Sequence, residues 1–240
     1  MRRLALSFGV VGLLALASLS LWATGRSTGA AQGPQPAVVG SDQCLSCHAD
    51  AQESLAKSVH GIARQGAGTP GAAGGCEACH GPGGAHVQAP SAANILSFAT
   101  ASAPAKSAPC LTCHARQEER FQARRSEHQL SDVSCDSCHA VHNPTARPQL
   151  REDTPQLCYR CHQEVRAQFD QRFRHRVNER AMSCADCHSP HGSFETKQIR
   201  RTASEPNPCV TCHGEKRGPF TFEHLSVRVE GCATCHAPHG

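Results

Sequence analysis

All cysteines of this chain occur in one repeated pattern, Cys-x-x-Cys-His. The 16 cysteines form eight such pairs, and a histidine directly follows each pair. Two thiols at this spacing can form thioether bonds to the vinyl groups on one edge of a porphyrin, and the adjacent imidazole can then bind the iron. Zinc sites and disulfide-exchange sites also use Cys-x-x-Cys, but they do not require this histidine. The pattern therefore predicts eight covalently bound haem c groups.

We number the eight motifs 1 to 8 in chain order. The predicted thioether cysteines are Cys44, Cys47, Cys76, Cys79, Cys110, Cys113, Cys135, Cys138, Cys158, Cys161, Cys184, Cys187, Cys209, Cys212, Cys232 and Cys235. The predicted proximal iron ligands are His48, His80, His114, His139, His162, His188, His213 and His236.

Eight histidines remain outside the motifs, one for each. After motifs 1, 3, 5 and 7, a histidine follows the proximal one by 12, 14, 13 and 11 residues; after motifs 2, 4, 6 and 8 it follows by 6, 3, 3 and 3 residues. One spare histidine per motif, at a recurring place, predicts one distal ligand per iron. The predicted distal ligands are His60, His86, His128, His142, His175, His191, His224 and His239.

The short spacing after motif 4 has a geometric consequence. His139 and His142 are three residues apart and so lie on one side of a turn, whereas the two axial positions of a haem iron lie on opposite faces of the porphyrin. We therefore expect His142 to reach the iron of a neighbouring haem. The same argument applies to His191 and His239, and such ligation would hold the haems close together.

The motifs divide the chain into four dihaem modules. The modules are predicted at 44–86, 110–142, 158–191 and 209–240, with a linker at 32–43 and an Ala/Ser/Pro-rich linker at 87–109. Residues 111–128 and 157–175 have the pattern of short amphipathic helices that run from a motif to a distal histidine. Gly/Pro-rich segments predict loops. We expect a mostly α chain with extensive loops and little or no sheet.

Large apolar side chains are scarce in most of the chain. The only tryptophan is Trp22, the only tyrosine is Tyr159, and 39% of all residues are apolar, many of them alanine or cysteine. Such a composition is poorly suited to a packed core of side chains alone. Apolar haem macrocycles would supply the missing volume, so the haem-free chain is expected to be largely unfolded.

The N-terminus has the layout of a secretory signal peptide, predicted at residues 1–31. Arg2 and Arg3 precede an uncharged, mostly apolar run at 4–23, and small residues follow it. A run of this length can also span a bilayer, so an uncleaved membrane anchor is the alternative. Either interpretation carries the cysteines out of the cytoplasm, and we expect a periplasmic location.

Haem irons with both axial positions occupied by histidine favour electron transfer over catalysis. The distal histidines suffice for all eight irons, and Met182 is the only methionine beyond Met1. A haem enzyme needs an open position for its substrate, and no catalytic residue is assigned here. The net charge of +4 gives no argument for nucleic-acid binding, because haem propionates would outweigh it. We therefore expect an electron carrier, with an octahaem reductase as the less favoured alternative.

Three stretches carry a family resemblance: SVHG at 58–61, CEACHGPGGAH at 76–86, and the repeated CHxPHG endings. They resemble the periplasmic multihaem cytochromes of the MtrA/DmsE type and the wider doubled-CXXCH group. The resemblance implies an elongated chain of stacked bis-histidine haems. It also implies a place in an outer-membrane β-barrel, a periplasmic or inner-membrane electron donor, and an outer-surface multihaem cytochrome as acceptor.

Haem number separates this chain from the named types, which typically carry ten haems, whereas eight fits the octahaem components of porin–cytochrome conduits. A soluble periplasmic shuttle that feeds a terminal reductase is the other electron-transfer alternative. The last motif, CATCHAPHG at 232–240, is expected to place its haem near one end of the conducting chain. No role follows from the sequence for Gly240.

Overall fold

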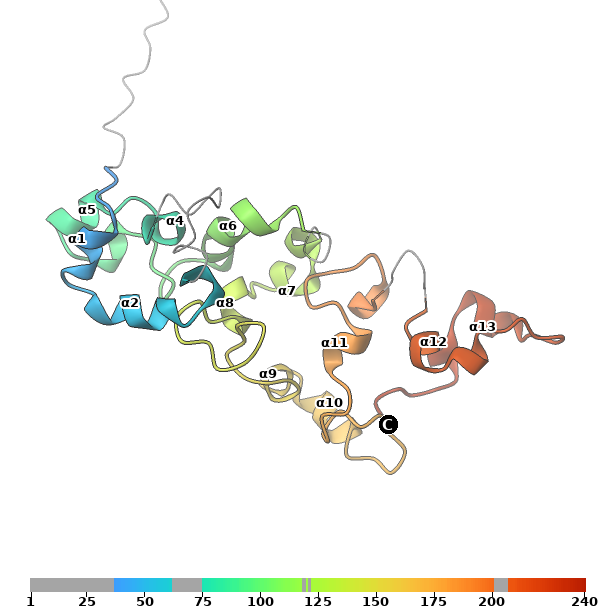
Figure 1. Cartoon of the computed structure of the whole chain (residues 1–240). Helices are drawn as coiled ribbons and strands as arrows, with labels where there is room; N and C mark the ends of the chain where they lie inside the picture. Colours follow the sequence, from blue (N-terminus) through green and yellow to red (C-terminus); the bar gives the residue numbers. More distant parts are fainter. Residues whose placement is uncertain (1–36, 62–74, 118–119, 121, 201–206) are drawn as a thin grey trace, which may run out of the picture. The chain divides into compact units, whose positions relative to one another are not determined.

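The fold is known from a computed structural model that describes residues 37–61, 75–117, 120, 122–200 and 207–240. The predicted signal peptide at 1–31 lies outside these residues. Short helices joined by long loops make up the described chain, as Figure 1 shows. No described helix is long and apolar enough to cross a membrane.

Most of the α-helices contain part of a Cys-x-x-Cys-His motif or begin directly after one. The α-helices are α1 (Ser41–Leu45), α2 (Ala49–Ala56), α4 (Glu77–His80), α5 (Gly84–Gln88), α6 (Ala103–His114), α7 (Glu127–Leu130), α8 (Cys135–Cys138), α9 (Gln156–Tyr159), α10 (Gln163–Gln168), α11 (Cys184–Cys187), α12 (Cys209–Cys212) and α13 (Leu225–Val229). The 3-10 turns are η2 (Ala92–Asn94), η3 (Ala123–Arg125), η4 (Thr196–Gln198), η5 (Gly214–Lys216) and η6 (Cys232–Thr234). Pairing between extended segments of the described residues is limited to isolated bridges. The predicted mostly α, loop-rich class is confirmed.

The predicted helices at 111–128 and 157–175 are each broken into shorter pieces. In the first segment, helix α6 ends at His114, and η3 and α7 follow it. The second segment contains two helices, α9 and α10, and α10 ends at Gln168. In the second segment the break lies at the proximal histidine. His162 has φ −97° and ψ 57°, outside the α region, and so ends one helical turn and begins the next. His48 and His213 adopt the same conformation.

The proximal histidines of motifs 4 and 6 leave their helices in a different way. His139 and His188 are extended, with ψ of 140° and 147°. The chain then turns back, and Ala140 N donates to Gln149 O at 2.8 Å as Ser189 N does to Gln198 O at 2.7 Å. Both glutamines have a left-handed backbone. Residues 135–151 and 184–200 are therefore one repeated structural unit.

The largest cluster of buried apolar side chains is small. Tyr159, Phe169 and Val177 form its centre, and Met182 packs against it. The Tyr159 hydroxyl donates to Asn178 Oδ1 at 2.8 Å, which satisfies the one polar atom of the ring. The described chain thus has little side-chain core of its own, as its composition suggests.

A carboxylate ties the first module together. Glu77, inside motif 2, accepts hydrogen bonds from the backbone N–H groups of Val39 at 3.0 Å, Gly40 at 2.9 Å and Gly83 at 2.7 Å. Burial raises the pKa of this carboxyl, but the three N–H groups outweigh burial, so the pKa lies below its ordinary value. The contribution of Glu77 to stability is therefore present above the unfolded-state pKa of about 4.3 and is lost as the pH falls below it.

We expect Glu77→Gln to lower the free energy of unfolding at pH 7 by about 1–3 kcal/mol, because an amide offers only one acceptor oxygen to three donors. Urea unfolding followed at the haem absorption band measures this. Glu53→Gln is the matched control: Glu53 pairs with Lys57 at 3.0 Å, but the two side chains are 81% and 60% exposed, so a change near zero is expected. Equal losses in both variants would contradict the role of Glu77.

Candidate haem-binding sites

Histidine rings face one another in pairs throughout the described chain. In each recorded pair, one ring is a predicted proximal ligand and the other a predicted distal ligand. The ring centroids are 6.3 Å apart for His48 and His86, 6.0 Å for His114 and His60, 6.0 Å for His139 and His191, 6.2 Å for His162 and His128, 6.0 Å for His188 and His239, and 6.2 Å for His213 and His175.

This separation suits an iron between the rings. A metal–nitrogen bond of about 2 Å on each side, plus a ring radius of about 1 Å on each side, places the centroids about 6 Å apart. The angles between the ring planes range from 21° to 84°. Such variation is compatible with metal binding, because each imidazole can rotate about its bond to the metal.

Two proximal histidines have no ring pair among these. Burial lowers the pKa of His142, and the charge of His80 lowers it further, so the two side chains lie within range of each other's charge. His224 and His236, the two histidines that then remain, are both exposed. The structure thus assigns a neighbour to seven proximal histidines and leaves the eighth to assignment by elimination.

The pairing runs between modules rather than within them. His191 and His239 each lie beside the proximal histidine of an earlier module, not beside the one three residues before them, and His142 lies within range of the charge of His80 in an earlier module. Conversely, His60, His128 and His175 pair with proximal histidines of the following module. These three follow the nearest preceding proximal histidine by 12 to 14 residues. Each pair of adjacent modules therefore exchanges two histidines. Within module 1, His86 pairs with His48.

The cysteines show which motifs are neighbours in space. Contacts bring the two motifs of each module together: Cys76 N donates to Ser41 Oγ at 3.2 Å, Cys135 N donates to Ser107 Oγ at 3.3 Å, Cys184 packs against the cluster around Tyr159, and Asn207 Nδ2 donates to Cys232 Sγ at 3.6 Å. Between modules, the charges of Cys79, Cys138 and Cys187 act on Cys110, Cys158 and Cys209. Motifs that are consecutive in sequence are therefore adjacent in space from 1 to 8.

Neighbouring thiols also alter each other's acidity in the haem-free chain. Cys110 donates a hydrogen bond to Cys135, which lowers the pKa of Cys135 to about 6 and raises that of Cys110. The pKa of Cys184 is lowered to about 7 by the equivalent bond from Cys158. Thioether formation would remove these protons, so the shifts mark proximity rather than a function of the finished protein.

Most ligand histidines present Nδ1 to an oxygen. The recorded acceptors are Leu96 O for His80, Ser91 O for His86, Gln117 Oε1 for His114, Pro190 O for His128, Pro148 O for His139, Ser54 Oγ for His142, Pro238 O for His175, Lys197 O for His188 and Gln168 Oε1 for His239. Donation from Nδ1 leaves the lone pair on Nε2, the nitrogen that faces a metal. Burial lowers the pKa of His60, His139, His142 and His239, which favours the neutral, metal-binding imidazole.

Exposed apolar side chains lie next to the distal histidines. Phe173, Phe194 and Phe222 are 80%, 78% and 92% exposed and lie within three residues of His175, His191 and His224. Arg172 lies over the Phe173 ring at 5.3 Å, and large exposed apolar side chains of this kind are available to cover an apolar group. The opposed imidazoles and the neighbouring cysteines fit a haem at the six paired sites, with the predicted thioether cysteines and both predicted histidine ligands as its anchors.

The sequence argument missed the role of the glycine in the PHG endings. Gly192 has φ +98°, and a Cβ there would lie 2.9 Å from Gln122 O. Gly240 has φ +141°, and a Cβ there would meet Gln168 O. In both endings the proline carbonyl accepts from a distal histidine, and the following histidine pairs with a proximal one. The identical sequence PHG at 190–192 and 238–240 could have indicated that the glycine has a structural role.

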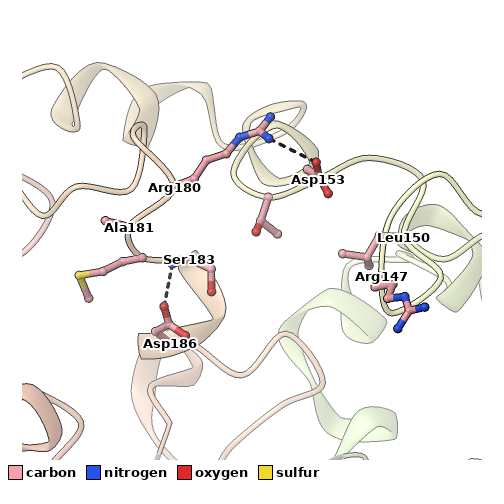
Figure 2. Close-up of a pocket in the computed structure, with 9 residues that line it drawn as sticks. Arg147, Leu150, Asp153, Arg180, Ala181, Ser183 and Asp186 are labelled. Carbon is pink, nitrogen blue, oxygen red and sulfur yellow. Dashed lines mark hydrogen bonds and ion pairs between the residues drawn. The ribbon is translucent and has the colours of Figure 1, made fainter.

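A polar pocket of about 430 Å³ lies beside α11, shown in Figure 2. Arg147, Arg180 and Asp153 line it, and Arg180 pairs with Asp153 at 3.5 Å. On its other side, Ser183 N donates to Asp186 Oδ2 at 2.7 Å. Guanidinium groups in this position suit carboxylates such as haem propionates.

Two family models match the chain. One, described as the doubled CXXCH motif, matches residues 128–167 and 175–218. The other, described as cytochrome c554 and c-prime, matches residues 18–81 and 86–140. Together they extend over most of the described structure.

Two curated proteins are similar to the chain. The multiheme cytochrome MtrA of Shewanella baltica is 38% identical over 193 residues, which is 78% of this chain and 57% of the relative. The cytochrome c-type protein NrfB of Escherichia coli is 27% identical over 109 residues, which is 40% of this chain and 56% of the relative. The chain thus spans little more than half the length of each relative.

Proposed function

The chain belongs to the multihaem c-type cytochromes of the MtrA type, and from this premise we propose that it carries electrons through eight bis-histidine haems. Bound haem would supply one-electron chemistry at the iron. The chain's own residues would hold each iron by two imidazoles and leave no position open to a substrate. We assign it no catalytic residue and regard it as an electron carrier rather than an enzyme.

The observation that carries this proposal is the order of the motifs in space. Contacts bring together the two motifs of a module, from Ser41 and Cys76 in module 1 to Asn207 and Cys232 in module 4, and across module boundaries cysteine charges influence the next motif. This order supports a path along which an electron that enters at one end would pass from haem to haem. A reductase would in addition need one iron with a position open to its substrate.

For its cellular role, we propose the periplasmic part of an outer-membrane conduit. The similarity to a protein named MtrA supports this role, and it implies a β-barrel and an outer-surface multihaem cytochrome as partners. The second candidate is a soluble periplasmic shuttle that feeds a terminal reductase. Co-purification with an outer-membrane barrel supports the conduit, whereas recovery as a free monomer in the periplasmic fraction supports the shuttle.

Haem counting and magnetic resonance test the carrier proposal. The mature protein is expected to contain eight covalent haems per chain and to show only low-spin iron when oxidised. Protein-film voltammetry should show reversible one-electron couples without catalytic current in the presence of nitrite. A high-spin iron in the oxidised protein, together with nitrite turnover, would instead establish the octahaem reductase alternative.

A further inference from the structure

His60 and His128 are held in the same way. Each follows a buried serine by two residues: Ser58 is 1% exposed and Ser126 is 4% exposed. The Ser58 hydroxyl donates to Leu55 O at 2.8 Å and the Ser126 hydroxyl to Ala123 O at 2.9 Å. The two histidines are therefore structural counterparts, and each pairs with a proximal histidine of the following module.

The partner of Nδ1 distinguishes them. His128 Nδ1 donates to Pro190 O at 3.0 Å, and His175 Nδ1, in the next module, donates to Pro238 O at 2.7 Å. His60 Nδ1 instead lies 2.9 Å from Nε2 of the Gln149 amide. That NH₂ group is a donor, whereas the nine oxygen partners described above can all accept. His86 also has a donor nearby, Ser91 N at 3.3 Å, but the Ser91 carbonyl is closer.

A backbone group fixes which way the Gln149 amide points. Val59 N donates to Gln149 Oε1 at 3.0 Å, so turning the amide over would set its NH₂ against the Val59 N–H. The position of Gln149 is itself held, because its carbonyl accepts from Ala140 N at 2.8 Å. The NH₂ group is therefore kept against His60.

This arrangement conflicts with a strong bond from His60 to iron. A neutral imidazole has one protonated nitrogen and one nitrogen with a lone pair. If Nε2 binds iron, the proton is on Nδ1 and points at the Gln149 NH₂. If Nδ1 accepts from Gln149, the proton is on Nε2, which then cannot bind a metal. One hydrogen bond must be lost for the iron bond to form.

We propose that Gln149 makes His60 the weakest distal ligand, so that the haem of motif 3, held by Cys110 and Cys113, opens to a diatomic π-acceptor ligand. The inference rests on the proposed function, in which His60 and His114 are the two ligands of that iron. On exchange, the iron–His60 bond breaks and a bond from iron to the incoming ligand forms. Nε2 of the released imidazole would take up a proton from water and Nδ1 would give its proton to water, so that Nδ1 accepts the Gln149 hydrogen bond with no change in electron count or total charge.

Carbon monoxide titration of the reduced, fully haem-loaded protein tests the proposal. The expected result is one haem that binds CO about tenfold more tightly than any other, the factor that one hydrogen bond supplies. In Gln149→Glu a carboxylate accepts from both Val59 N–H and His60 Nδ1–H, so this preference should disappear. Gln117→Glu is the matched control on the other axial side of the same iron: Gln117 Oε1 already accepts from His114 Nδ1 at 2.8 Å, so CO binding should persist.

Counting CO-reactive haems assigns the site. In His60→Ala the number of readily CO-reactive haems should stay at one, because the same haem is now permanently open. In His128→Ala the number should rise to two. A rise to two in His60→Ala would overturn the proposal, and so would uniform CO resistance of eight low-spin haems. That last result would leave the carrier function intact, whereas loss of covalent haem or a high-spin oxidised protein would defeat the proposed function itself.

Discussion

The His191→Ala variant is expected to contain one open iron, at the haem of motif 4, although His191 lies three residues after the proximal histidine of motif 6. The His191 ring faces His139 with a centroid separation of 6.0 Å and an interplanar angle of 21°. Removing the imidazole would leave that iron with His139 alone. The oxidised variant should show a high-spin signal equal to one haem in eight.

Removal of single haems identifies the open iron. In a background with Cys135→Ala and Cys138→Ala, the His191→Ala change should add no high-spin signal, because the affected haem is absent. In a background with Cys184→Ala and Cys187→Ala, the same change should still add it. The opposite result would mean that His191 serves the motif in which it lies, and the exchange of histidines between modules would be refuted.

Gly192→Ala is expected to lower the free energy of unfolding by about 2–4 kcal/mol, because it combines a strained backbone with a steric clash. A Cβ at this position would lie 2.9 Å from Gln122 O and 3.2 Å from Ser126 Cβ. Neither atom is the end of a flexible side chain. Ser126 also accepts from Gln129 N at 3.1 Å and so caps the turn that carries His128. The variant should therefore also weaken ligation at motif 5.

Urea unfolding and the low-spin signal measure the two effects of Gly192→Ala. Gly214→Ala is the control, since Gly214 has no atom within 4 Å of a Cβ and no positive φ. It should change the free energy of unfolding by less than about 0.5 kcal/mol or stabilise slightly. If Gly214→Ala were as harmful as Gly192→Ala, the close approach of the PHG ending would not be the cause.

The features that rest on short-range chemistry could be predicted from the sequence. The Cys-x-x-Cys-His spacing is set by the porphyrin edge, and the scarcity of large apolar residues predicts the small side-chain core. The opposite faces of a haem iron imply that His142, His191 and His239 reach other motifs, and the structure places His191 and His239 beside earlier proximal histidines. Their role as iron ligands stays a prediction.

Features that depend on contacts between distant segments could not be predicted. A separation of 12 to 14 residues from the proximal histidine does not reveal that His60, His128 and His175 pair with the module that follows. The amphipathic pattern at 157–175 predicts one helix, but the backbone of His162 interrupts it. The roles of Gly192 and Gln149 depend on which segments pack beside them, and local propensity carries no information on that.

The exchange of histidines between modules sets an order in time for a chain that emerges from a translocation pore with its N-terminus first. His114, His162 and His213 find their partners upstream, in residues that have already emerged. His80, His139 and His188 must wait for partners in the module that comes next. Assembly would then proceed stepwise from the N-terminus, and each arriving module would complete the last haem site of the module before it. A nascent chain stopped between modules would always show one reactive iron at its growing end.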